Sequence, residues 1–131
     1  MSDRVPALIV MHADLAAALL RAAEKVYGPV EGVETLSGEG LSRDDMIGEV
    51  CRRVERWEHG GIVLTDFWGG SCHLSGVTAA RGRGEVIVVS GCNLPMLLDY
   101  LHNRDQLEPS TLAERIQKKG QESIRVKRSA A

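Results

Sequence analysis

The stretch Ile62-Val63-Leu64-Thr65-Asp66-Phe67-Trp68-Gly69-Gly70-Ser71 decides the fold prediction, because it joins a short apolar run to a carboxylate and a glycine turn. Residues 61–66 are rich in apolar, β-branched side chains, which is typical of a strand covered on both faces of a parallel sheet. The two glycines and the serine that follow are typical of a turn. The stretch therefore predicts a buried strand that ends in polar groups.

A second apolar run, Ala7-Leu8-Ile9-Val10, ends in a similar way at Met11-His12. Side chains at the carboxyl ends of neighbouring parallel strands meet in one crevice. We therefore expect the imidazole of His12, the carboxylate of Asp66 and the glycine-rich turn to converge at one edge of the sheet.

Strand-like and helix-like segments alternate along the chain. Apolar residues at helical spacing predict a helix from Leu15 to Val26, and Ser42 with Asp45 predicts the capped start of a second. Further strands are predicted at residues 30–36 and 85–90, and a short edge strand is predicted at 123–127. Further helices are predicted to begin after Asn93 and at Thr111, where Glu114 follows three residues later as in a capping box. Right-handed crossovers then favour a parallel sheet of order 2-1-3-4. Its winding reverses between the first and third strands, where ligands bind.

Length and composition predict one domain. The chain has 131 residues with 44% hydrophobic content, enough for a single core, and a domain of residues 1–131 is expected. A net charge of -2 gives no electrostatic case for nucleic acid. No apolar run reaches the length of a membrane span and no signal peptide is recognisable, so a cytoplasmic location is expected. Three widely spaced cysteines favour reduced thiols.

His12 and Asp66 together suit phosphoryl transfer. A neutral imidazole can accept a phosphoryl group on one ring nitrogen while its other nitrogen donates to a carboxylate, which fixes the tautomer. Backbone N–H groups in the turn of Gly69 and Gly70, with the hydroxyl of Ser71, would hold the phosphate oxygens at a helix start. In the plainer interpretation, His12 is only a first-turn residue of a helix and Asp66 only a cap.

Three segments resemble a known family. Ala7–His12, Leu64–Ser71 and Ser90-Gly91-Cys92-Asn93-Leu94-Pro95-Met96-Leu97-Leu98 are similar to the IIA domain of the mannose family of the bacterial phosphoenolpyruvate-dependent sugar phosphotransferase system. The similarity in spacing covers roughly residues 5 to 127. It implies a flavodoxin-like three-layer α/β sandwich acting as a histidine phosphocarrier.

In such a carrier, the resemblance implies that phosphorylated HPr loads His12, which passes the phosphoryl group to a IIB domain. It assigns the orienting carboxylate to Asp66 and the turn serine to Ser71. It also implies a homodimer in which an antiparallel edge strand, here residues 123–127, can be exchanged between subunits.

The turn departs from the family pattern. Where the family usually has proline and asparagine after the serine, this chain has Cys72 and Leu74. Ala13 stands where glycine is common directly after the histidine. These changes leave open a second reading, a regulatory binding module controlled by its phosphorylation state and without sugar transport. Trp68, His73 and Leu74 are the candidates for contact with a partner.

No cofactor or metal is expected from the sequence. His12, Asp66, Cys72 and His73 offer metal-binding atoms, but they lack a helical His-x-x-x-His or a Cys-x-x-Cys pair. Cys92 precedes a predicted helix, and we interpret it as a small buried residue rather than a reactive thiol.

Overall fold

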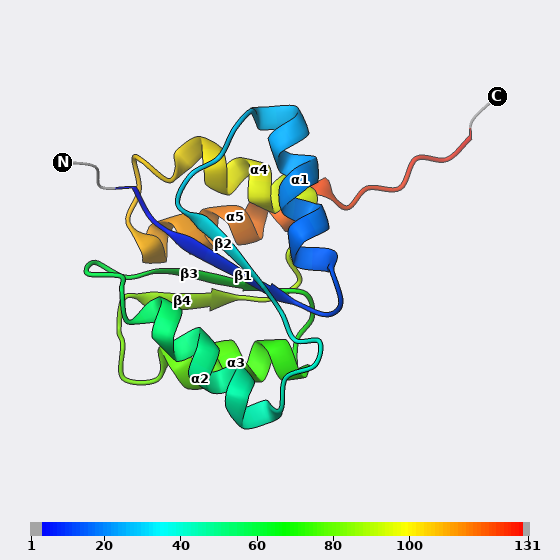
Figure 1. Ribbon diagram of the computed structural model, residues 1–131. Coiled ribbons are helices and arrows are strands. Elements are labelled where there is room, and N and C mark those ends of the chain that lie inside the picture. The colour runs from blue at the N-terminus through cyan, green and yellow to red at the C-terminus, as the bar shows by residue number, and fades with distance from the viewer. Residues whose placement is uncertain (1–3, 130–131) are drawn as a thin grey trace.

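The computed structural model describes residues 4–129, and Figure 1 shows strands and helices alternating along most of this part of the chain. The elements are β1 (Ala7–Met11), α1 (Leu15–Tyr27), β2 (Val33–Ser37), α2 (Arg43–Val54), β3 (Gly61–Thr65), α3 (Ser71–Ala80), β4 (Val86–Val89), α4 (Leu94–Asn103) and α5 (Pro109–Ser123).

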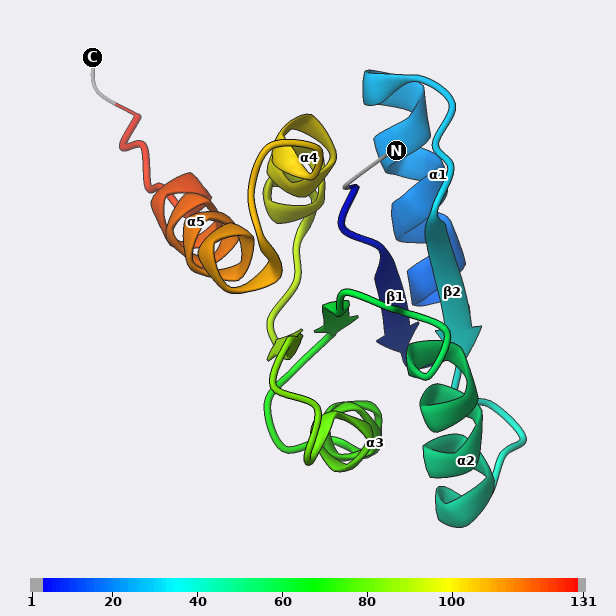
Figure 2. The same ribbon diagram turned by 90° about the vertical axis from the view of Figure 1, so that its left-hand side faces the viewer.

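The four strands form one parallel sheet in the order β2-β1-β3-β4. Helices α1, α4 and α5 cover one face of the sheet, and α2 and α3 cover the other, as Figures 1 and 2 show. In register, Ile9 of β1 lies between Thr35 of β2 and Leu64 of β3. The α/β fold and the strand order predicted from the sequence are therefore confirmed.

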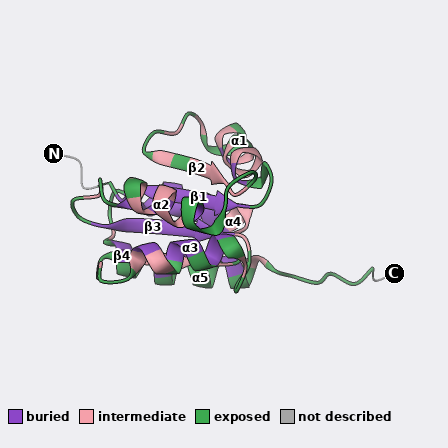
Figure 3. Ribbon diagram, turned by 60° about the horizontal axis from the view of Figure 1, so that its bottom comes forward, coloured by how far each residue is buried: buried purple, intermediate pink, exposed green. Residues whose placement is uncertain are grey.

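Two apolar cores lie on the two faces of the sheet, because successive side chains of a strand point to opposite sides. In β1, Ile9 and Met11 belong to the core under α1, α4 and α5, whereas Leu8 and Val10 belong to the core under α2 and α3. All five residues of β1 and all five of β3 are buried, and both strands are purple in Figure 3. This double burial explains why both sequences read as uninterrupted apolar runs.

Local sequence signals place several helix starts. The Ser42 hydroxyl accepts a hydrogen bond from the Asp45 amide at 3.1 Å, and the Asn93 side chain accepts one from the Met96 amide at 3.0 Å. The predicted start of the last helix was wrong, because α5 begins at Pro109 rather than at Thr111. Proline has no N–H and its fixed φ suits the first helical position, so Pro109 determines the start.

The predicted edge strand at 123–127 is not formed in the single chain. Ser123 ends α5, and residues 124–129 extend away from the sheet, as Figure 1 shows. The side chains of Ile124 and Val126 are 76% and 85% exposed. A strand forms only when its backbone groups pair with another strand, and within the described residues this segment has no such pair.

Among residues 4–129, no helix is both long and apolar enough to cross a membrane.

Candidate functional site

His12 follows β1 directly and Asp66 follows β3 directly, and the two side chains meet at the carboxyl edge of the sheet. Asp66 Oδ2 accepts a hydrogen bond from the His12 backbone N–H at 2.9 Å and lies 2.7 Å from His12 Nδ1. In the neutral imidazole, this contact places the proton on Nδ1 and leaves the lone pair on Nε2. The His12 side chain is 48% exposed, so the ring is open to a reaction partner.

The carboxylate of Asp66 is held in its charged form. Burial alone would raise its pKa, but the hydrogen bonds from the backbone and ring of His12 outweigh that effect and hold the pKa below its usual value. Asp66 Oδ1 accepts a further hydrogen bond from the Phe67 backbone N–H at 3.1 Å. Asp66 is therefore a fixed negative charge against one nitrogen of the ring.

The backbone turns sharply after His12, and Ala13 takes a positive φ of 50°. This left-handed region is strained for a residue with a Cβ atom. The turn returns the chain into α1, and the Leu15 amide donates to the His12 carbonyl at 3.1 Å. The strained residue is the one directly after the histidine.

The aromatic ring of Phe67 stacks on the imidazole of His12, with centroids 5.1 Å apart and planes 20° apart. Gly70 makes room for this ring, because a Cβ at position 70 would lie 2.7 Å from Phe67 Cζ. Gly69 provides a positive φ of 87° in the same turn. The glycines therefore position an aromatic wall of the site. Phe67 was not predicted as a site residue, although its place directly after Asp66 was an available signal.

The first turn of α3 lies against the other side of the site. Gly70 is the N-cap, and no side chain among residues 4–129 caps this helix end, so within this range the first amide groups of α3 have no side-chain acceptor. Ser71 is the first residue of the helix and is exposed. The sulfur of Cys72 lies 3.8 Å from His12 Nδ1. Burial and the nearby charge of Asp66 raise the pKa of the Cys72 thiol to about 11, so it is protonated at neutral pH.

The three candidates for contact with a partner lie in different surroundings. Trp68 is 80% exposed and Leu74 is 40% exposed, so both are accessible. His73 is buried, with Trp68 at 4.4 Å between ring centroids and Thr65 Oγ1 at 3.4 Å from its Nδ1. The assignment of His73 as a partner-facing residue is therefore wrong. Cys72 and His73 are buried whereas the next residue, Leu74, is exposed, because successive side chains of a helix point in different directions around its axis.

Cys92, which was interpreted from the sequence as a small buried residue, is partly buried. Its burial raises the pKa of the thiol to about 12, and the Cys92 amide donates to the Thr65 carbonyl at 3.0 Å. A thiol that stays protonated at neutral pH is a poor nucleophile, so Cys92 is not expected to be reactive.

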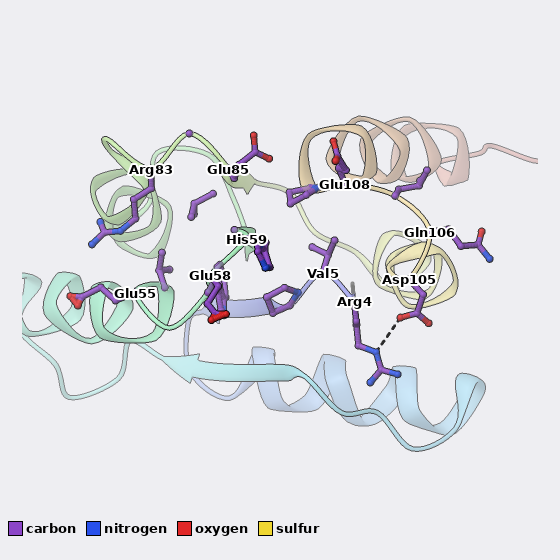
Figure 4. Close-up of a pocket in the computed structure, with 18 residues that line it drawn as sticks. Arg4, Val5, Glu55, Glu58, His59, Arg83, Glu85, Asp105, Gln106 and Glu108 are labelled. Carbon is purple, nitrogen blue, oxygen red and sulfur yellow. Dashed lines mark hydrogen bonds and ion pairs between the residues drawn. The ribbon is translucent and has the colours of Figure 1, made fainter. Parts of the chain in front are cut away.

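A pocket of about 970 Å³ lies at the opposite, amino-terminal edge of the sheet. Figure 4 shows it between the turn after α2, the turn before β4 and the loop between α4 and α5. Arg4 and Asp105 form an ion pair of 3.2 Å there. Its other labelled acidic residues are Glu55, Glu58, Glu85 and Glu108. The pocket shares no residue with the His12 site.

Fold and site define a class of protein: a doubly wound parallel α/β domain with an exposed histidine, held by an aspartate, beside the switch point of the sheet. The family model described as PTS system fructose IIA component matches residues 7–117. The chain belongs to this family and is a component of the phosphotransferase system. The family resemblance seen in the sequence is thereby confirmed.

Solved structures agree with this family. The chain is similar to the phosphotransferase system component EIIA from Streptococcus agalactiae, with 25% identity, a TM-score of 0.86, and 93% of this chain and 96% of that one covered. It is also similar to the mannose/sorbose specific IIA subunit from Enterococcus faecalis, with 17% identity, a TM-score of 0.81 and 98% of each chain covered.

A third similar structure is the PTS IIA protein associated with the fucose utilization operon from Streptococcus pneumoniae. It has 23% identity and a TM-score of 0.78, and the match covers 89% of this chain and 91% of that one. The last two likenesses show the shared fold. A search of curated proteins found no significant match.

Proposed function

We propose that the chain is a histidine phosphocarrier, which accepts a phosphoryl group from phospho-HPr on Nε2 of His12 and passes it to a IIB domain. The contact between Asp66 Oδ2 and His12 Nδ1 carries this proposal, because it leaves Nε2 as the free nucleophilic nitrogen. Since its donor is a bacterial cytoplasmic carrier, we place the chain in the cytoplasm.

The transfer exchanges one nitrogen-phosphorus bond for another. The Nε2 lone pair of His12 attacks phosphorus, and the electron pair of the breaking bond returns to the histidine of HPr. The ring of His12 gains positive charge, which the neighbouring Asp66 carboxylate stabilises through the proton on Nδ1. The same steps in reverse order deliver the phosphoryl group to the acceptor.

The phosphoryl oxygens carry negative charge, and the start of α3 offers a place for them. Its first amide groups have no capping side chain, and the positive end of the helix dipole lies there. The sulfur of Cys72, in this first helical turn, lies 3.8 Å from the ring. We therefore assign phosphate binding to the turn of Gly69 and Gly70 and to Ser71.

Phosphorylation of the purified chain tests the proposal. Incubation with phosphoenolpyruvate, enzyme I and HPr is expected to add one phosphoryl group per chain, measured by intact mass. His12→Ala should not be labelled, whereas His102→Gln, which changes an exposed histidine of α4, should be labelled normally. Unchanged labelling of His12→Ala would refute the assignment.

A regulatory role is the second candidate, and the exposed side chain of Leu74 favours it. An apolar side chain at this position cannot supply the hydrogen bonds of the family's amide to a phosphate or a partner. We expect the chain to be loaded by HPr but to transfer slowly to a IIB domain from the same genome. Fast transfer, with no gain in the Cys72→Pro/Leu74→Asn double variant, would favour sugar uptake instead.

We also propose that the chain forms a homodimer. The exposed side chains of Ile124 and Val126 lie on an extended segment whose backbone can pair with a sheet edge of a second chain. Light scattering at micromolar concentration should give about twice the chain mass of 14.3 kDa. A mass equal to that of one chain would contradict the dimer.

A further inference from the structure

Three different metal-binding atoms meet at the carboxyl edge of the sheet. Nδ1 of His12, a carboxylate oxygen of Asp66 and Sγ of Cys72 all lie within 4.8 Å of one another. The residues come from three separate segments: the ends of β1 and β3 and the first turn of α3. The fold brings these atoms together without any short sequence motif.

Two of the distances between these atoms can be compared with the spacing of ligands around a small tetrahedral ion. Zinc bonds of the usual lengths place a ring nitrogen, a carboxylate oxygen and a sulfur about 3.3–3.6 Å from one another. The distance from Cys72 Sγ to His12 Nδ1 is 3.8 Å, close to that requirement. The 2.7 Å contact between His12 Nδ1 and Asp66 Oδ2 has to open by about 0.6 Å when a metal ion replaces the shared proton.

The chemistry of the three groups selects the ion. A thiolate and an imidazole with one carboxylate suit zinc, whereas magnesium and calcium prefer sites made of oxygen ligands. The half-exposed ring of His12 leaves one side open to solvent, as in zinc sites with three protein ligands and a water. His73 is not part of the set, because it is buried beside Trp68 and Thr65.

We propose that His12, Asp66 and Cys72 bind one Zn²⁺ ion, and that this ion switches off phosphoryl acceptance. The second half rests on the proposed function. When zinc takes Nδ1, the imidazole proton moves to Nε2, and the thiol proton of Cys72 is released to solvent. Nε2 then has no lone pair for attack on phosphorus. The ion therefore blocks transfer by changing the tautomer of His12.

Binding is tested with Co²⁺, which reports a thiolate ligand by a charge-transfer absorption band in the near ultraviolet. Titration of the reduced, full-length chain with CoCl₂ should produce this band with one ion per chain, and added ZnCl₂ should abolish it. Cys72→Ser should lose the band, whereas the matched variants Cys51→Ser and Cys92→Ser should keep it.

The affinity for zinc provides a second measurement that does not depend on phosphorylation. Loss of a group that only supports a metal ligand costs about 10–100-fold in affinity, so loss of the Cys72 sulfur should cost at least that much. His12→Ala should weaken binding similarly. A missing charge-transfer band, or a band that persists in Cys72→Ser, would overturn the site.

The switch is tested by loading from phospho-HPr with and without ZnCl₂. Zinc should slow loading of the parent chain at concentrations that fill the cobalt-defined site, and loading of Cys72→Ser should not respond to the same zinc. If zinc slowed the loading of both proteins equally, it would be acting on another component of the assay, such as HPr, and the proposed switch would be refuted. A chain that binds cobalt but is not phosphorylated even without zinc would refute the carrier function and leave the metal site standing.

Discussion

Replacing Asp66 by asparagine removes the negative charge at the site while keeping the shape of the side chain. Asp66 Oδ2 faces two N–H groups of His12, from the backbone and from the ring. The asparagine must therefore place its amide oxygen there, and its NH₂ group then faces the backbone N–H of Phe67. The substitution loses that one hydrogen bond and the charge beside the ring.

The expected effect follows from the difference between charged and neutral hydrogen bonds. A hydrogen bond to an ionised group contributes about 1.5–3 kcal/mol, against about 0.5–1.5 kcal/mol between neutral groups. The ring of His12 becomes positive during transfer, so the difference of about 1–2 kcal/mol appears in the barrier. Loading of Asp66→Asn should be about 5–30-fold slower.

Single-turnover loading from phospho-HPr in a rapid-quench instrument measures this rate. Asp14→Asn is the matched control, because it removes an exposed charge near His12 that caps no helix by hydrogen bonding. Its loading rate should stay near that of the parent. If Asp66→Asn loads at the parent rate while its circular dichroism is normal, the carboxylate has a structural role only and the reasoning fails.

Two further predictions concern stability. Ala13→Gly should stabilise the fold by about 0.5–1 kcal/mol in urea unfolding, because glycine relieves the positive φ of an exposed residue; a loss of stability would contradict the assigned strain. Because the folded-state pKa of Asp66 lies below its ordinary value, its contribution to stability is complete above about pH 4 and is lost as the pH falls through the folded-state pKa. The stability advantage of the parent over Asp66→Asn should therefore be present at neutral pH and shrink as the pH falls below about 4, and an advantage that grows on acidification would be inconsistent with a lowered pKa.

The sequence predicted the parts of the fold that depend on burial. The apolar runs of β1 and β3 are readable because both faces of each strand are covered, and the right-handed winding rule then orders the sheet. The meeting of His12 and Asp66 follows from the same topology. Each of these signals is contained in a few neighbouring residues or in the order of the elements.

Features that depend on side-chain direction could not be read in this way. Cys72 and His73 are adjacent in the sequence, yet their side chains point to different neighbours. The sulfur of Cys72 lies near the ring of His12, whereas the ring of His73 packs against Trp68. Their directions depend on how α3 is rotated against the sheet, where Gly76 allows close approach to Val63. The segment 123–127 is a different case, because an edge strand also requires a pairing partner.

The attacking nitrogen of His12 is the most direct test of the account. The chain, labelled with ¹⁵N-histidine and loaded through HPr, should show phosphorus coupling to Nε2 of one of its four histidines, and His12→Ala should lose that signal. Coupling to Nδ1, the nitrogen that Asp66 holds, or to a histidine other than His12 would contradict the central claim.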